Sequence, residues 1–300
     1  MKKILICGYF SLPYKTNTAG DLLVLDSLTK ILTKMGYDFD IISDNSIELI
    51  NNSVILEDVV PSDYFMLIFV CGPLVNTKTF RDFINNFQNM KKIAINVSVI
   101  SEHQSVLDCF DHVIPRDSEL ETNIDLAIGS PKITHTPVVG LIFVGQQKEY
   151  TNQLHDKVTE TVNEVLSEIE IAKVYIDTKL PFNEYGLKNS AEIETLISKM
   201  DFIITTRLHG CVLALKNKVP FIAIDPVSNG AKILKQTQKM KWPLCVCVNN
   251  LEKNTLKQYI FDIINGNYNE QVVETLEYSK NLFEDFSCDL QNRLEVFLND

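Results

Sequence analysis

A chain of 300 residues is long enough for two domains of ordinary size or one large domain. Its 45% hydrophobic and 22% charged residues are a globular composition with enough apolar mass for a sizeable core. The net charge of −11 repels nucleic acid and anionic membranes, so we expect no nucleic-acid partner, and any anionic ligand would need a local cationic pocket.

The amino-terminal half alternates short β-rich runs with helical patterns. The first run, in "MKKILICGYFSLP", imitates a signal peptide, but it is short and lacks a small-residue cleavage site, so we predict a first strand. In chain order, we predict strands over Ile4–Gly8, Phe39–Ser43, Phe65–Cys71, Ile93–Val99 and His112–Ile114, and helices over Gly20–Met35 and Lys78–Met90.

The same alternation begins again in the second half. We predict strands over Val138–Gly145, Lys173–Ile176, Phe202–Thr205, Pro220–Ile224 and Leu244–Val248, and helices over Asn152–Ile169, Ser190–Met200, His209–Lys216 and Gly230–Met240. The tail from Leu251 is nearly all helix, broken near Gly266–Asn269. Alternating strands and helices predict an α/β fold of two Rossmann-like, doubly wound parallel sheets. The join falls in "GSPKITHTP", which divides the chain into domains 1–133 and 134–300.

Compartment and metal content follow from the cysteines and the apolar runs. The seven cysteines include no CxxC pair, and the five histidines are scattered, which predicts a reducing, cytoplasmic location and no metal site. No apolar stretch reaches the ~18 residues that cross a bilayer, so we expect no integral membrane segment.

"TTRLHG", residues 205 to 210, is the strongest candidate site. Arg207 and His209 lie where a buried strand passes into a helix, and parallel sheets bind ligands at this end of their strands. Arginine offers a planar fork for a carboxylate or phosphate, histidine moves protons near neutral pH, and the helix amino end favours anions. The alternative is an arginine that binds a neighbouring carbonyl beside a structural histidine, and position alone does not separate the two.

Other polar segments also follow predicted strands. In "DPVSNGAK", Asn229 and Gly230 could begin a helix whose amides face a bound anion, with Lys232 in its first turn; taken alone, a solvated lysine is the slightly better interpretation. "GQQKEY" offers Gln146, Gln147 and Glu149 as acceptors for sugar hydroxyls.

Two segments of the first half complete the set. "NTAGD" contains Asn17, Gly20 and Asp21 between the first strand and the first helix, but it matches neither common phosphate-loop pattern, and Asp21 can also favour the helix start. "PRDS" offers Arg116 as a second cation, with Asp117 or Ser118 as a helix cap.

These segments together resemble the polysaccharide pyruvyl transferase family. "DFIITTRLHGCVLALKNKVPFIAIDPVSNGAK" resembles its carboxyl-terminal signature, "NTAGD" its amino-terminal Asn–Gly–Asp element and "FDHVIPRDSE" its middle Arg–Asp–Ser element, in the same order and spacing. The chain departs from the family in "CGPLVN", where many members have a glycine run, and in the longer spacing between Asn17 and Gly20.

The resemblance implies a GT-B-like pair of domains that face each other across a cleft. It also implies phosphoenolpyruvate as donor, a sugar or polysaccharide-precursor acceptor whose two hydroxyls form a pyruvate ketal, and phosphate as by-product. Arg207 and His209 then match the donor-site motif and Arg116 a second donor contact, while domain 1–133 is the acceptor side. No cofactor or metal is needed, because arginines can stabilise the anionic groups directly.

Three functions stay open from the sequence. The first is the pyruvyl transferase, in which Arg207, Arg116 and Lys232 hold the donor and His209 acts as acid or base. The second is a GT-B-type glycosyltransferase that uses a nucleotide sugar. The third is a non-catalytic member in which internal salt bridges occupy the motif cations. The acceptor sugar, its attachment to a lipid, a peripheral membrane association and the oligomeric state are also open.

Overall fold

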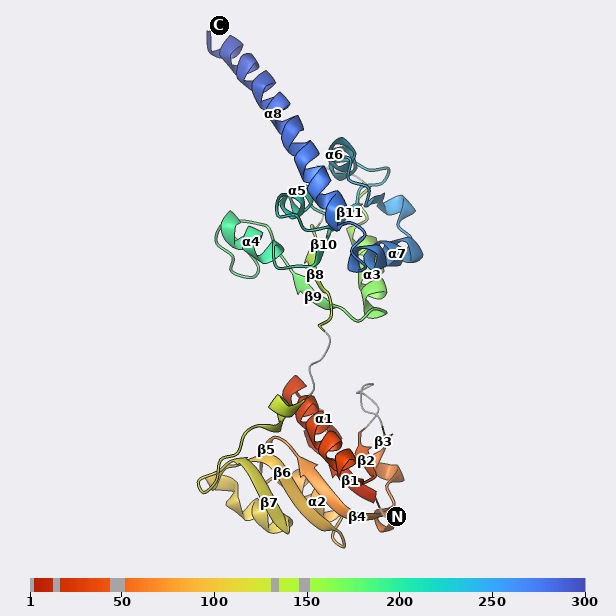
Figure 1. Ribbon diagram of the computed structural model, residues 1–300, viewed down its shortest axis with the longest axis vertical. Coiled ribbons are helices and arrows are strands. Elements are labelled where there is room, and N and C mark those ends of the chain that lie inside the picture. Colours follow the sequence, from red (N-terminus) through yellow and green to blue (C-terminus); the bar gives the residue numbers. More distant parts are fainter. Residues whose placement is uncertain (1–2, 13–16, 44–51, 131–134, 146–151, 300) are drawn as a thin grey trace. The chain divides into compact units, whose positions relative to one another are not determined.

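The computed structural model describes residues 3–12, 17–43, 52–130, 135–145 and 152–299 (Figure 1). The chain divides into two compact units, Met1–Ile133 (unit 1) and Thr134–Asp300 (unit 2). Each unit has its own parallel sheet with helices between the strands, which confirms the predicted fold class.

Unit 1 contains a sheet of seven strands that are all paired in parallel. They are β1 (Lys3–Cys7), β2 (Phe39–Ile42), β3 (Ser53–Val54), β4 (Tyr64–Val70), β5 (Pro73–Leu74), β6 (Lys91–Val99) and β7 (His112–Asp117). The order β3-β2-β1-β4-β6-β5, with β7 also on β6, reverses direction between β1 and β4. In doubly wound sheets, such a reversal opens a crevice at the carboxyl ends of the two strands.

In the part of unit 1 that the structure describes, two α-helices cover the sheet, α1 (Ala19–Lys34) and α2 (Lys78–Asn85), together with 3-10 turns. Alternate residues of β1 enter two separate core clusters, with Leu5 beside the apolar face of α2 and Ile6 beside that of α1. The continuous apolar run of β1 follows from this burial on both faces. Helix α2 ends five residues before the predicted end at Met90, because residues 86–90 form turns.

Unit 2 contains a five-stranded parallel sheet in the order β12-β11-β10-β8-β9. Its strands are β8 (Val138–Ile142), β9 (Ala172–Tyr175), β10 (Phe202–Thr205), β11 (Phe221–Asp225) and β12 (Cys245–Cys247). Strand β9 lies on one side of β8, whereas β10, β11 and β12 lie on the other. The reversal therefore falls between β8 and β10, directly before the "TTRLHG" segment.

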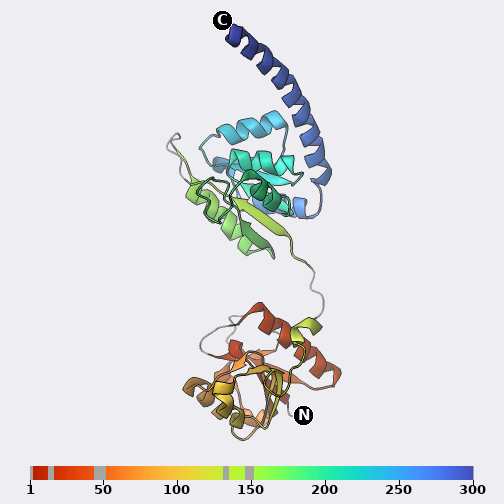
Figure 2. The same ribbon diagram turned by 90° about the vertical axis from the view of Figure 1, so that its left-hand side faces the viewer.

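Among its described residues, unit 2 has six helices: α3 (His155–Ser167), α4 (Ser190–Ile197), α5 (Leu208–Lys216), α6 (Lys232–Met240), α7 (Lys253–Ile264) and α8 (Asn269–Asn299). The predicted break in the tail is the junction between α7 and α8. Helix α8 extends well beyond the rest of unit 2 (Figure 2). Over the residues described, no helix combines the length and apolarity needed to cross a membrane, and no group of three or more His, Cys, Asp or Glu side chains could hold a metal ion.

Candidate functional site

The turn from β10 into α5 is fixed by two buried threonines. The Thr205 hydroxyl accepts a hydrogen bond from the Arg207 amide at 3.0 Å, and the Thr206 hydroxyl accepts one from the Val144 amide at 2.9 Å. The Thr206 amide donates to the Ile142 carbonyl. These bonds attach the turn to the end of β8, so the side chains that follow have a defined position at the reversal of the sheet.

Gly210 allows α5 to lie directly against the sheet. A Cβ atom at this position would stand 2.2 Å from the Thr205 hydroxyl and 3.2 Å from a methyl group of Ile142. The glycine of "TTRLHG" is therefore a packing requirement, and it sets how closely the amino end of α5 approaches β10 and β8.

Arg207 is the residue before α5 and points towards the end of β8. Its Nε donates to the Phe143 carbonyl at 3.0 Å, and its Nη2 lies 3.8 Å from Oδ1 of Asp177, an ion pair too long for a hydrogen bond. The side chain is 18% exposed. Burial lowers the pKa of Arg207, and the Asp177 carboxylate opposes that shift only in part. This cation is thus partly desolvated and weakly paired.

A pocket of about 350 Å³ lies beside Arg207, at the amino end of α5. Its lining includes Thr206, Arg207, His209 and Lys232, and its described lining residues include no carboxylate. His209 is exposed, and no hydrogen bond or ion pair engages its imidazole among the residues described. The first amides of α5 add partial positive charge. The structure thus brings together three predicted residues, Arg207, His209 and Lys232, in one cationic pocket.

The segment after β11 differs from its prediction. Helix α6 begins at Lys232, two residues later than expected, because Asn229 and Gly230 have φ of +67° and +78° and form a left-handed turn. A Cβ on Gly230 would also stand 2.5 Å from Leu234. The Asn229 amide donates to Oδ1 of Asn249 at 2.8 Å.

The amino end of α6 already holds a carboxylate of the chain itself. Asp225, which is 1% exposed, accepts hydrogen bonds from the amides of Ala231 at 2.7 Å, Leu234 at 3.0 Å and Val227 at 3.2 Å. The interpretation in which the α6 amides face a bound anion therefore fails for Ala231 and Leu234, because Asp225 already accepts from both.

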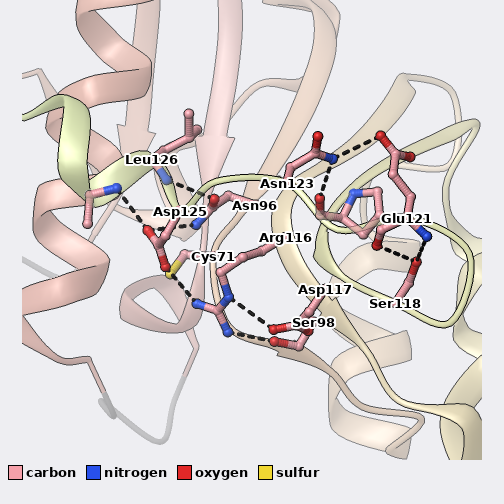
Figure 3. A network of polar contacts seen from close by, with 12 residues as sticks. Cys71, Asn96, Ser98, Arg116, Asp117, Ser118, Glu121, Asn123, Asp125 and Leu126 are labelled. Atoms are coloured by element: carbon pink, nitrogen blue, oxygen red, sulfur yellow. Dashed lines mark hydrogen bonds and ion pairs between the residues drawn. The ribbon is translucent and has the colours of Figure 1, made fainter.

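Arg116 lies in a dense polar network at the end of the unit 1 sheet (Figure 3). Its Nη1 donates to Asp125 at 3.1 Å, its Nε to Asp117 at 3.2 Å and its Nη2 to the Ser98 hydroxyl at 2.6 Å. Burial lowers the pKa of Arg116, but its hydrogen bonds to Asp125 and Asp117 and their negative charges outweigh burial and raise the pKa overall. All the donor nitrogens of this guanidinium therefore have internal partners.

The "PRDS" segment itself is extended. Pro115, Arg116 and Asp117 belong to β7, and Ser118 binds the backbone of Leu120 and Glu121 in a turn. The prediction of a helix cap here is wrong, because β7 continues to Asp117 and no helix follows Ser118 before the 3-10 turn at Leu126–Gly129.

The "NTAGD" residues lie at the start of α1, near the reversal of the unit 1 sheet. Asp21 accepts from the Thr18 amide at 2.7 Å, and Thr18 accepts from the Asp21 amide, so the pair forms a capping box. The second oxygen of Asp21 accepts from the Cys71 thiol at 2.7 Å. Gly20 is exposed in the first turn of α1, and Asn17 is partly buried just before it. Asp21 thus caps its own helix.

The structure adds carboxylates that the sequence interpretation left out. Asp177 accepts from the amides of Lys179 at 3.0 Å and Glu184 at 3.2 Å. Burial raises its pKa, but these amides and Arg207 hold it below the usual value overall. Asp225 is the last residue of β11, Asp177 lies two residues after β9, and Asp125 directly precedes the 3-10 turn at Leu126–Gly129. A position at the end of an element is the only signal that could have found them. Gln146, Gln147 and Glu149 lie outside the described residues.

The chain was compared with curated proteins and with solved structures. A search of curated proteins gave no match. Among solved structures, a UDP-GlcNAc 2-epimerase from Methanocaldococcus jannaschii is 12% identical, over 93% of this chain and 100% of that one, with a TM-score of 0.31. A UDP-N-acetylglucosamine 2-epimerase from Listeria monocytogenes is 9% identical, over 91% and 90%, with a TM-score of 0.30. A spinosyn rhamnosyltransferase with bound spinosyn aglycone is 8% identical, over 92% and 95%, with a TM-score of 0.34.

TM-scores this low carry no conclusion about activity or about the arrangement of the two units. The family comparison is more informative, because the model described as "Polysaccharide pyruvyl transferase" matches residues 19–229. That range exceeds half of the chain and contains the candidate site residues of both units except Asn17, Gly230 and Lys232, which lie just outside it. The chain therefore belongs to the polysaccharide pyruvyl transferase family, a family of transferase enzymes.

Proposed function

We propose that the chain transfers the pyruvyl group of phosphoenolpyruvate onto two hydroxyls of a sugar in a polysaccharide or its precursor. The product is a ketal and the by-product is inorganic phosphate. Family membership supports the reaction class. The observation that carries the proposal is the pocket at the α5 amino end, where Arg207, His209 and Lys232 meet without any carboxylate among the described lining residues.

The charges of this pocket suit a small ligand that carries both a phosphate and a carboxylate. Arg207 and the first amides of α5 bind the phosphate of the donor, because partly desolvated charge-assisted contacts are each worth roughly 1.5–3 kcal/mol. Lys232 lines the same pocket and adds a second positive charge for the carboxylate. The pocket also lies at the reversal between β8 and β10, where parallel sheets bind their ligands.

His209 moves the proton that starts the reaction. Protonated His209 donates to the methylene carbon of phosphoenolpyruvate, which becomes the methyl group and leaves the central carbon electrophilic. One sugar hydroxyl adds to the central carbon. The bond between that carbon and the phosphate oxygen then breaks, and the second hydroxyl adds to the same carbon and closes the ketal. Of the two hydroxyl protons, one restores His209 and the other leaves with phosphate. Proton transfer of this kind contributes ~10²–10⁴ in rate.

Thermal unfolding of the full-length protein tests the donor assignment. Phosphoenolpyruvate at ~100 times its dissociation constant should stabilise the folded state by about 2.7 kcal/mol and raise the unfolding midpoint. The shift should vanish in Arg207→Ala and persist in Lys216→Ala, an exposed lysine at the far end of α5. A shift with UDP-sugars alone would contradict the proposal and favour a glycosyltransferase.

A second candidate, a member that keeps the fold without the reaction, has one observation in its favour. Each of the three side-chain nitrogens of Arg116 donates to Asp117, Asp125 or Ser98, as expected where motif cations serve internal salt bridges. Arg207 lacks such saturation, since only its Nε makes a hydrogen bond among the residues described. Absence of any shift with either ligand would favour this candidate.

A further inference from the structure

A second, smaller pocket adjoins the first in unit 2, and Arg207 lines both. It measures about 180 Å³, roughly half the first pocket, and its lining includes Tyr175, Asp177, Lys179, Glu184 and Tyr185. Its position next to Arg207 places any occupant beside a donor bound in the first pocket.

The charges of the two pockets differ in kind. The described lining of the smaller one contains two cations, Arg207 and Lys179, and two carboxylates, Asp177 and Glu184, so the formal charges cancel. A dianion would meet repulsion from both carboxylates, whereas a neutral ligand rich in hydroxyls could donate to the carboxylates and accept from the cations. The larger pocket has no carboxylate in its described lining, so it favours an anion over a neutral ligand.

Two tyrosine rings belong to the lining of the smaller pocket, beside the apolar side chains of Leu141, Phe143 and Ile176. Tyr175 is 46% exposed at the end of β9, and Tyr185 is 52% exposed on the following loop. The two lie close enough to interact electrostatically. Half-exposed rings beside hydrogen-bonding groups form a platform for the C–H face of a pyranose, since tyrosine combines an apolar body with a polar tip.

The loop that presents Tyr185 is held in shape by side chains of its own. The Asn183 amide group donates to the carbonyls of Asp177 at 2.7 Å and Lys179 at 3.1 Å, and its oxygen accepts from the amides of Tyr185 at 2.9 Å and Leu187 at 3.1 Å. Asp177 fixes two further amides. The loop is therefore preorganised, which lowers the ordering cost of binding a weakly held ligand.

We propose that the smaller pocket is the acceptor subsite and binds one pyranose ring of the sugar substrate against Tyr185 and Tyr175. This inference rests on the proposed function and deepens it. It assigns the first acceptor contacts to unit 2, whereas the family resemblance placed the acceptor side in domain 1–133. Arg207 then touches the donor on one side and the acceptor on the other, which brings the sugar hydroxyls to the reacting carbon.

Saturation-transfer NMR with the full-length protein tests the subsite. The probes are methyl glycosides of glucose, galactose, mannose and N-acetylglucosamine at millimolar concentration. Ring protons of at least one glycoside should receive saturation from the wild type, and Tyr185→Ala should weaken that binding about tenfold. The matched control is Phe182→Ala, because Phe182 is an aromatic of the same loop, 90% exposed and outside the lining of either pocket.

The outcomes separate the two proposals. Equal loss in Phe182→Ala and Tyr185→Ala, or no saturation of any glycoside by the wild type, overturns the subsite. The unfolding shift with phosphoenolpyruvate should be the same in Tyr185→Ala as in the wild type, and its loss there would assign the smaller pocket to the donor. Glycoside binding at Tyr185 without any phosphoenolpyruvate shift would keep the subsite and overturn the proposed reaction.

Discussion

Arg116 in unit 1 and Arg207 in unit 2 both come from family motifs at the carboxyl ends of parallel strands, yet their surroundings differ. Arg116 binds two carboxylates and a hydroxyl, and its pKa is raised because Asp125 and Asp117 outweigh the effect of burial. Burial lowers the pKa of Arg207, which keeps one distant carboxylate partner. A cation whose charge is already balanced gains little from an anionic ligand. A partly desolvated cation with weak pairing gains more, which makes Arg207 the stronger candidate for a donor contact.

The largest effect is expected at His209, the residue that distinguishes the unit 2 site from the unit 1 network. His209→Ala should lower kcat ~10²–10⁴-fold, because general acid catalysis contributes that much. Phosphate release from phosphoenolpyruvate in the presence of an acceptor measures it. The control is His112→Ala, an exposed histidine at the start of β7, which should retain full activity.

Matched substitutions of the two arginines put the comparison itself to the test. Arg207→Lys should lower kcat/KM for phosphoenolpyruvate ~10–150-fold, because lysine cannot reproduce the guanidinium contacts, each worth roughly 1.5–3 kcal/mol. Arg116→Lys should change it less than about threefold, since the retained charge still pairs with Asp117 and Asp125. Equal losses would mean that Arg116 leaves its network to bind the donor, and Arg207 would then not be the stronger donor contact.

Two motif glycines at helix starts offer a comparison of stability. Gly210→Ala should destabilise unit 2 by ~1–3 kcal/mol, because the new methyl group collides with Thr205 in a packed core. Gly20→Ala should be neutral or stabilise α1 by up to ~1 kcal/mol, since the nearest atom is 3.4 Å away and the site is exposed. Urea unfolding measures the change in the free energy of unfolding for each variant. An equal loss of stability in both variants would show that Gly20 also has a packing role.

The smallest effect is expected in the pH dependence of stability. Despite the opposing effect of burial, hydrogen bonds and arginine charges hold the pKa values of Asp177 and Asp125 below their usual range. Their stabilisation is therefore complete above the unfolded-state pKa of ~3.9 and is lost as pH falls through the lower folded-state values.

Unfolding midpoints between pH 7 and pH 3 measure the stabilisation that the two ionised carboxylates contribute. Asp177→Asn and Asp125→Asn should each be less stable than the wild type at pH 7, and the difference should shrink towards pH 3. Asp177→Asn should show the larger change, because its side chain is 11% exposed and that of Asp125 is 40% exposed. A constant difference across this range would contradict the assignment of these carboxylates as charged hydrogen-bond acceptors.

The sequence predicted the parts of this molecule that depend on local pattern. Continuous apolar runs such as Phe202–Thr205 predicted strands buried on both faces, and the polar residues directly after them predicted the edge at which Arg207 and His209 lie. The order of the strands is a matter of long-range pairing. The reversal between β8 and β10, which positions the pocket, could therefore not be inferred from pattern alone.

The errors arose where a side chain interacts beyond its neighbours. Asp225 looked like one polar residue of a loop, but its partners are amides two, six and nine residues further on, and only the left-handed turn at Asn229 and Gly230 brings them together. Arg116 appeared to follow a strand because "PRDS" contains a proline and polar residues, yet parallel pairing with β6 extends β7 through Asp117. Tertiary pairing outweighed local propensity in that segment.

The carboxylate of Asp225 has a consequence for turnover. Helices α5 and α6 follow neighbouring strands of one sheet, and either amino end could attract phosphate, but Asp225 has closed the second. If the proposed reaction holds, inorganic phosphate should rebind at the amino end of α5, since Asp225 already binds amides at the start of α6. Product inhibition should then be purely competitive with phosphoenolpyruvate, with a single inhibition constant and no mixed component as the product accumulates.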